Sequence, residues 1–136
     1  MKTITIIGAG PAGIAAAIQL KLSGFDPLIF EKDKIGGLLK NANLIENYPG
    51  FPDGILGNEL IELFQRQFKD NQVNINYENV QNLDYRDESF SIKTDKRILK
   101  SDIIVIASGT SPRKLSEELI NNTCPDKILY EIYSIK

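Results

Sequence analysis

The segment TITIIGAGPAG, residues 3–13, joins a run of β-branched residues to a glycine-rich turn. A short apolar run of this kind is typical of a buried parallel strand. Residues 12–23 are rich in alanine, leucine and isoleucine, which favours a helix, and Gly24 stands where a helix-ending glycine is expected. The apolar triplet LIF, residues 28–30, predicts a second strand. The first 31 residues therefore predict a βαβ unit.

The turn carries a GxGxxG motif, made by Gly8, Gly10 and Gly13. In this context Gly8 permits a tight turn out of the strand, and Gly10 lets the backbone approach a pyrophosphate. Gly13 lets the helix pack closely against the strand. The start of the helix offers unpaired N–H groups and a partial positive charge to phosphates, and Pro11 loses no needed hydrogen bond there. The motif predicts a dinucleotide phosphate site.

A carboxylate, Glu31, follows the second predicted strand, 18 positions after Gly13. It could accept hydrogen bonds from both hydroxyls of an adenosine ribose, and it would repel a 2′-phosphate. The alternative is a solvated charge at a strand end. The βαβ context favours ribose binding.

The sequence after residue 31 predicts four further structural segments. Residues 32–57 are dense in glycine and proline, which predicts a long irregular segment. Residues 58–70 have apolar side chains at helical spacing, with Asn58 as a capping residue. Residues 73–100 predict a small antiparallel meander with one solvated face, and residues 103–107 predict another buried strand.

Two glycine-containing segments and one loop are further candidates for ligand contact. Gly36-Gly37 is either an ordinary turn or a close approach of the backbone to a ligand. Asn47 lies in the loop ENYPGFP, which either seals the core or recognises a heterocycle. The small residues 107–110 follow a predicted strand, and ligands of open α/β sheets bind beyond such carboxyl ends. We favour shared ligand contact over a simple strand exit.

Composition excludes several functions. The chain has 136 residues, enough for one compact domain, and a net charge of −2, which disfavours a broad nucleic-acid surface. It has no histidine and one cysteine, Cys124, so it lacks the ligands of a usual zinc site, an intrachain disulfide and histidine-dependent catalysis. The chain has no apolar stretch of about 18 residues, so no membrane-spanning helix is predicted. We expect a cytoplasmic protein. The chemistry must come from backbone amides, carboxylates or a cofactor.

Four segments in order, GAGPAGIAAAIQL, FEKDKIGGLL, ENYPGFPDGILGNEL and IIVIASGTSPRKL, resemble one known series. The chain resembles the N-terminal FAD-binding segment of thioredoxin reductase-like pyridine nucleotide–disulfide oxidoreductases, from about residue 3 to 115. The resemblance implies an α/β fold of the Rossmann-like, three-layer ββα type. This FAD/NAD(P)-binding fold has a parallel sheet and a small antiparallel meander, and we expect it to be incomplete here.

The resemblance also implies cofactor contacts. Those expected near the pyrophosphate and the ribose are Gly8, Gly10, Pro11, Ala12, Gly13, Glu31 and Lys32. Those expected along the ribityl chain, the isoalloxazine ring and the adenine are Gly36, Gly37, Leu38, Asn47 and Val80, and Ala107, Ser108 and Gly109 match the second FAD motif. Relatives often carry glutamine where Leu38 stands. We predict no catalytic residue and no metal ligand.

In this family an NAD(P)H domain with its own glycine motif, and often a redox CxxC, follows the segment seen here. Neither is present in the chain. We therefore expect residues 1–115 to be the N-terminal part of an FAD domain, and residues 116–136 to be a tail or crossover towards an NAD(P)H domain. In the complete protein, hydride would pass from NAD(P)H to FAD, and electrons would pass on to a disulfide or another acceptor. The chain alone would be inactive.

Three functional hypotheses stay open. The chain could be the FAD-binding part of such an oxidoreductase, working with a complementary chain or the missing half, or as a homodimer. It could instead be a stand-alone module that binds an adenine dinucleotide without turnover. It could also be a non-enzymatic remnant that binds neither. A flavin band in the visible spectrum of the purified chain would support the first hypothesis, and binding of an adenine nucleotide without flavin absorbance would distinguish the second from the third.

Overall fold

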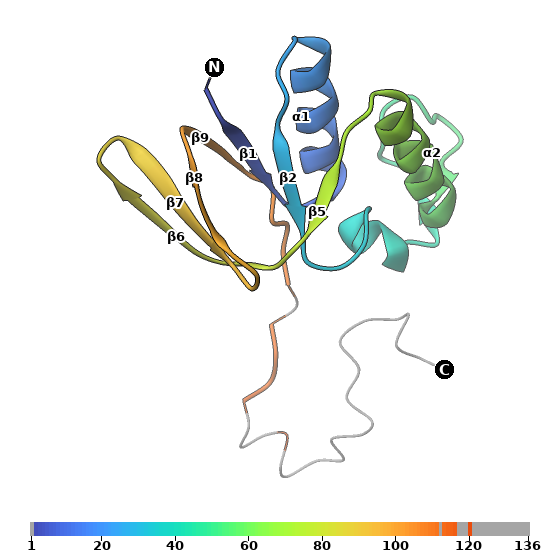
Figure 1. The fold of residues 1–136 in the computed structure, drawn as a ribbon. Helices are drawn as coiled ribbons and strands as arrows, with labels where there is room; N and C mark the ends of the chain where they lie inside the picture. The colour runs from blue at the N-terminus through green and yellow to red at the C-terminus, as the bar shows by residue number, and fades with distance from the viewer. Residues whose placement is uncertain (1, 112, 117–119, 121–136) are drawn as a thin grey trace.

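The computed structural model of the chain describes residues 2–111, 113–116 and 120. Most of the expected crossover at 116–136, together with Cys124, lies outside the described residues. Figure 1 shows a central sheet, two longer helices and a separate group of antiparallel strands.

The central sheet is parallel throughout, with the order β5-β2-β1-β9. Its strands are β1 (Ile4–Ile7), β2 (Leu28–Glu31), β5 (Ile75–Tyr77) and β9 (Ile103–Ile106). Three of them confirm the strands predicted from the apolar runs, to within one residue at each end. All the strand ends that matter for a ligand therefore meet at one edge of the sheet.

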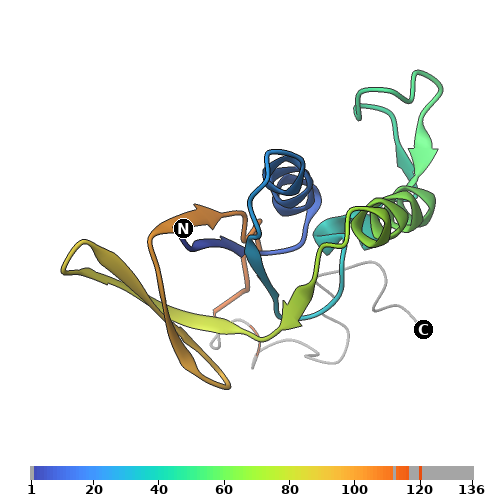
Figure 2. The same cartoon turned by 45° about the horizontal axis from the view of Figure 1, so that its top comes forward.

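Both longer helices lie on one side of this sheet, as Figure 2 shows. They are α1 (Pro11–Leu22) and α2 (Gly57–Asp70). The core on this side is formed by buried side chains of the sheet and both helices, among them Ile6, Ile14, Ile29, Leu60, Phe64 and Phe68. No helix among the described residues is long and apolar enough to cross a bilayer.

The predicted capping role of Asn58 is wrong. Leu56 occupies the N-cap position of α2, and no side chain caps the helix. Gly57 is the first helical residue, and a Cβ atom built there would overlap the carbonyl oxygens of Leu39 and Ala42. A neighbouring segment, and not a local side chain, therefore fixes where this helix begins.

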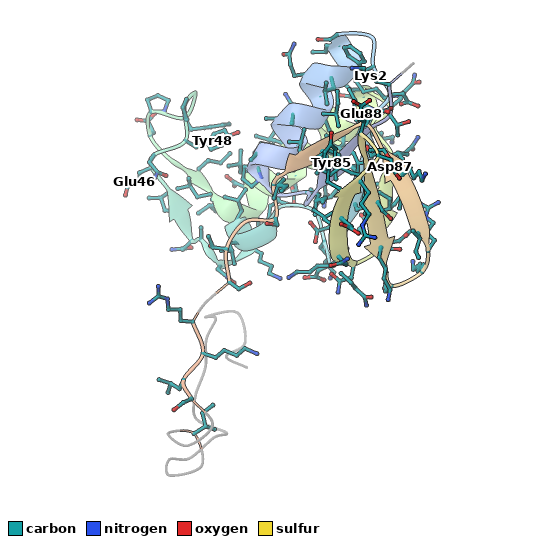
Figure 3. All side chains as sticks on the ribbon, turned by 90° about the vertical axis from the view of Figure 1, so that its left-hand side faces the viewer. Lys2, Glu46, Tyr48, Tyr85, Asp87 and Glu88 are labelled. Carbon is teal, nitrogen blue, oxygen red and sulfur yellow. The ribbon has the colours of Figure 1, made fainter. Side chains whose placement is uncertain are left out.

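The antiparallel meander lies on the other side of the sheet from the helices (Figure 2). It consists of β6 (Val80–Arg86), β7 (Ser89–Thr94) and β8 (Ile98–Ser101). Asp87 and Glu88, with φ angles of 50° and 58°, form the turn between β6 and β7 (Figure 3). Helices, parallel sheet and meander make the three layers that the resemblance implies.

The meander starts later than the predicted range 73–100. The strand β5 belongs to the parallel sheet, where it pairs with β2. The side-chain amide of Asn76 donates to the carbonyl oxygen of Ile29 at 3.2 Å, which supports this pairing. Apolar residues alternate with asparagine in this segment because β5 is an edge strand of the parallel sheet. An edge strand is partly exposed, as a strand of an antiparallel meander is, so the two give the same alternation.

The segment 32–57 is more regular than predicted. It contains the 3₁₀ helix η1 (Gly37–Asn41) and the strands β3 (Leu44–Ile45) and β4 (Ile55–Leu56). The two strands pair and form an arm that projects beside α2 (Figure 2). Strands of two residues leave too short a pattern to be predicted from alternation.

Gly13→Ala is expected to lower the free energy of unfolding by roughly 1–3 kcal/mol, because overpacking forces backbone shifts. A Cβ atom at position 13 would overlap the carbonyl oxygen of Gly8. Urea unfolding monitored by circular dichroism measures the change. Gly10→Ala is the matched control, since a Cβ there meets no heavy atom within 4 Å. Equal stability of the two variants would contradict the close approach of strand and helix.

Candidate dinucleotide site

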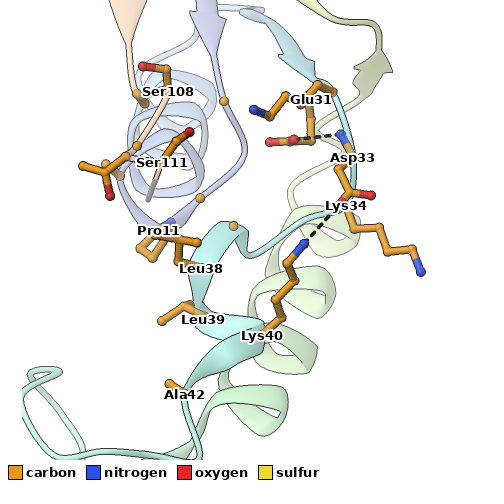
Figure 4. Close-up of a pocket in the computed structure, with 18 residues that line it drawn as sticks. Pro11, Glu31, Asp33, Lys34, Leu38, Leu39, Lys40, Ala42, Ser108 and Ser111 are labelled. Carbon is orange, nitrogen blue, oxygen red and sulfur yellow. Dashed lines mark hydrogen bonds and ion pairs between the residues drawn. The ribbon is translucent and has the colours of Figure 1, made fainter. Parts of the chain in front are cut away.

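A cleft of about 480 Å³ lies beyond the carboxyl ends of β1, β2 and β9 (Figure 4). Its walls come from the glycine turn, the loop after β2, η1 and the segment after β9. The predicted residues that it brings together are Gly8, Gly10, Pro11, Ala12, Glu31, Lys32, Gly37, Leu38, Ala107, Ser108 and Gly109. Segments that are far apart in the sequence thus share one surface.

Backbone contacts form the floor of the cleft. Gly8 has a φ angle of 102°, and its N–H donates to the carbonyl oxygen of Phe30 at 2.8 Å. A Cβ atom at Gly8 would overlap the carbonyl oxygen of Ala107, and one at Gly13 would overlap the carbonyl oxygen of Gly8. Side chains at these positions would push β1, α1 and β9 apart.

The start of α1 faces the cleft with free donors. No side chain caps this end, and Gly10 occupies the N-cap position with an extended backbone. The first bond within the helix runs from the N–H of Ile14 to the carbonyl oxygen of Gly10, at 3.0 Å. The N–H groups of Ala12 and Gly13 precede that bond, so they belong to the unpaired first turn. Such an end attracts anionic groups, phosphates above all.

Glu31 is buried, with 9% of its surface exposed, so the alternative of a solvated charge is wrong. Its Oε2 accepts a hydrogen bond from the N–H of Ala9 at 2.8 Å, and its Oε1 accepts one from the N–H of Asp33 at 2.9 Å. The carboxylate therefore joins the glycine turn to the loop after β2. Each carboxylate oxygen has a second lone pair, so both can still accept a hydrogen bond from a ligand.

An ion pair crosses the rim of the cleft. The Asp33 Oδ2 and Lys40 Nζ atoms lie 2.9 Å apart and connect the loop after β2 with η1 (Figure 4). The hydrogen bond from Lys40 lowers the pKa of Asp33, and the charges of Lys40, Lys34 and Lys32 lower it further. Sequence reasoning missed this pair, although the density of lysines between residues 32 and 40 was a visible signal.

The opposite end of the cleft is apolar. Leu38, Leu39 and Ala42 line it, close to Pro11 (Figure 4). Leu38 is 44% exposed, a large fraction for a leucine beside a cleft. The cleft therefore combines a charged end near Glu31 with an apolar end, which suits a ligand with phosphates at its centre and a flat ring at one end.

A smaller recess of about 130 Å³ continues from the cleft past Glu31. Its walls include Phe30, Asn79 and Val80. It shares Gly8, Glu31, Lys32 and Ser108 with the main cleft. The structure thus brings Val80, predicted as a ligand contact, to the same site as the glycine turn.

Three predicted residues line neither the cleft nor the smaller recess. Gly13 lies beneath the glycine turn, and Gly36 packs against the side chain of Ile61. Asn47 lines a separate hollow of about 260 Å³, formed by Glu46–Pro52 on the arm. Glu46 and Tyr48 mark this arm in Figure 3, well away from the meander. The described residues therefore do not place Asn47 at the cleft, where its contact with the isoalloxazine ring is predicted.

Comparison with known proteins decides the family. The family model described as pyridine nucleotide-disulphide oxidoreductase matches residues 2–128. The chain belongs to this family. Its similarity to thioredoxin reductases, expected from the four segments, is confirmed by relatives and by solved structures.

Among the relatives of this chain, NADPH-dependent thioredoxin reductase 3 of Arabidopsis thaliana is 34% identical over 119 residues, covering 85% of the chain and 22% of the relative. Thioredoxin reductase of Chlamydia trachomatis is 34% identical over 116 residues, covering 83% of the chain and 37% of the relative. The crystal structure of Lactococcus lactis thioredoxin reductase superposes with a TM-score of 0.78 at 31% identity, covering 90% of the chain and 41% of that protein. The predicted Rossmann-like fold is confirmed, and the chain spans well under half the length of these relatives.

Lys40→Met is expected to raise the pKa of Asp33 towards its ordinary value, because the hydrogen bond from Lys40 is the main cause of the lowering. A pKa that is lower in the folded than in the unfolded chain stabilises the fold above the ordinary aspartate pKa, about 3.9, and the effect is lost as the pH falls through the lowered pKa. NMR titration of the Asp33 carboxyl carbon measures the shift. Lys69→Met, in the last turn of α2, is the control, and identical Asp33 curves in wild type and Lys40→Met would refute the pairing.

Proposed function

We propose that the chain forms the FAD-binding part of a thioredoxin reductase-like NAD(P)H oxidoreductase. The observation that carries the proposal is the convergence of the α1 start, Glu31 and the segment after β9 on one cleft. Membership of the pyridine nucleotide-disulphide oxidoreductase family and the similarity to thioredoxin reductases support it.

The cleft fits the parts of FAD in order. The open space at Gly10 and the unpaired N–H groups of α1 would hold the pyrophosphate. The Glu31 carboxylate would accept hydrogen bonds from the ribose of the adenosine, and the recess beside Val80 would take the adenine. The apolar end of the cleft at Leu38 and Leu39 would contact the flavin half of FAD. The bound FAD supplies the redox chemistry, and the chain supplies binding and orientation.

The activity of the whole protein is part of the proposal. Residues 1–115 would form the FAD-binding part, and residues 116–136 would lead towards a domain that binds NAD(P)H. Hydride would pass from NAD(P)H to FAD, and electrons would pass on to a disulfide or another acceptor. A complementary chain or a further part of the protein would complete the site, and the protein would act in the cytoplasm as a homodimer.

One observation favours the second candidate, a stand-alone module for adenine dinucleotides. The described residues assemble the elements expected to hold phosphate, ribose and adenine, whereas Asn47, expected beside the flavin, lies on the separate arm. A chain that binds ADP or NAD but no FAD would fit this candidate.

Gly10→Val is expected to weaken FAD binding by at least about tenfold, or about 1.4 kcal/mol. The side chain would enter the open space beside the α1 start, where a Cβ meets no heavy atom within 4 Å. Flavin absorbance of the chain after equilibrium dialysis against FAD measures the affinity. The free energy of unfolding should fall by only about 1 kcal/mol, because the extended backbone at Gly10 accepts a side chain but valine is a poorer N-cap residue than glycine.

The matched control is Ala15→Val, which adds a branched side chain on the exposed face of the same helix, outside the cleft lining. It should retain the wild-type affinity for FAD. Full FAD affinity in Gly10→Val would overturn the placement of the pyrophosphate. A wild-type chain that takes up no FAD from excess but binds ADP would favour the dinucleotide module instead.

A further inference from the structure

The smaller recess depends on a two-residue connection between two sheets. β5 ends at Tyr77 in the parallel sheet, and β6 begins at Val80 in the meander. The residues between them, Glu78 and Asn79, both line the recess with Val80. Any movement of this connection would therefore change the shape of the recess.

The turn between β7 and β8 holds this connection in place (Figure 1). Asp95 Oδ1 accepts a hydrogen bond from the N–H of Asn79 at 2.8 Å, and the N–H of Asp95 donates to the carbonyl oxygen of Asn79 at 3.0 Å. The Lys96 Nζ donates to the carbonyl oxygen of Tyr77 at 2.6 Å. Thr94 Oγ1 donates to Glu78 Oε2 at 2.7 Å. The turn thus contacts every residue from the end of β5 to the start of the meander.

An ion pair between the buried Glu78 and the half-exposed Arg97 stands at the centre of these contacts. Glu78 is 9% exposed, and its Oε1 lies 2.9 Å from Nη2 of Arg97. The Nε of Arg97 donates to Glu78 Oε2 at 3.2 Å, so the guanidinium contacts both carboxylate oxygens. Loss of Arg97 would leave a buried carboxylate without its cation, which destabilises the surrounding structure.

Arg97 also reaches the two strands beside the recess. Its Nη2 donates to Oδ1 of Asn76 in β5 at 3.0 Å. Its guanidinium carbon lies 5.6 Å from the centre of the Phe30 ring in β2, a cation–π contact. Phe30 and Glu78 line the recess, whereas Arg97 does not. Arg97 therefore contacts the walls of the recess from behind.

We propose that Arg97 and Glu78 are positioning residues that hold the recess in the shape required by an adenine ring. The inference rests on the proposed function, which places the adenine beside Val80. In this proposal, the affinity of the site for adenine depends on the contacts that Arg97 and Glu78 make around the recess. These contacts act through the Phe30 side chain and the Glu78-Asn79 connection. The hydrogen bonds and the ion pair described for Arg97 and Glu78 do not reach Gly10, at the pyrophosphate end.

The test uses the full chain, ¹⁵N-labelled, titrated separately with ADP and with inorganic pyrophosphate. The amides of Val80 and Gly10 report the two ends of the site. The wild type is expected to bind ADP more tightly than pyrophosphate, with a shift at Val80 for ADP only. Arg97→Met is expected to reduce this preference for ADP by about tenfold and to leave the pyrophosphate affinity unchanged. A purely structural role would reduce both affinities together.

The matched control is Arg86→Met. Arg86 is also an arginine of the meander, paired with Asp84 at 2.8 Å, but its side chain is 80% exposed and lines no part of the recess. It should retain the wild-type preference for ADP. Should Arg97→Met fail to fold, the double variant Glu78→Gln/Arg97→Met removes the unpaired charge and tests the same contact.

The outcomes separate the inference from the proposed function. An undiminished preference for ADP in Arg97→Met or in the double variant overturns the inference, while wild-type binding of ADP at Val80 and Gly10 leaves the proposed function intact. A wild-type chain in which neither amide responds to either ligand overturns both.

Discussion

The contact of three backbones at Gly8, Gly13 and Ala107 is the constraint on which the site depends. Because neither glycine carries a side chain, α1 packs directly on the turn that follows β1, and the end of β9 lies against the same turn. This packing brings the start of α1 to the carboxyl edge of the parallel sheet. The proposed phosphate-binding position results from close packing alone, without a charged side chain.

Polar contacts then connect the segments that line this edge of the sheet. The buried Glu31 carboxylate joins the glycine turn to the loop after β2, and the Asp33–Lys40 pair joins that loop to η1. Apolar side chains, Leu38 and Leu39, line the far end. The layout has a charged half and an apolar half, which suits the flavin dinucleotide that we propose as the ligand. Family membership and the geometry of the cleft thus support the same function.

The sequence predicted the parts of the fold that local patterns encode. Three patterns depend only on residues that are close in the sequence, so they could be interpreted without the structure. They are the β-branched run before Gly8, the GxGxxG spacing and the apolar periodicity of residues 58–70. The sequence could not show that β5 joins the parallel sheet or that Gly57 begins α2, because both depend on distant backbone contacts. The Arg97–Glu78 pair was missed for the same reason, since 19 positions separate the two residues. Asn47 was assigned from its amide in a proline-rich loop and by resemblance, whereas the structure places it on the arm, outside the cleft lining.

We infer that the glycine turn and Glu31 together bind one adenine dinucleotide. A crystal structure of the chain with ADP would test this inference most directly. We expect the pyrophosphate at the start of α1 beside Gly10, the ribose hydroxyls within hydrogen-bond distance of Glu31, and the adenine against Val80. An ADP molecule whose phosphates lie elsewhere, or whose ribose makes no contact with Glu31, would contradict it.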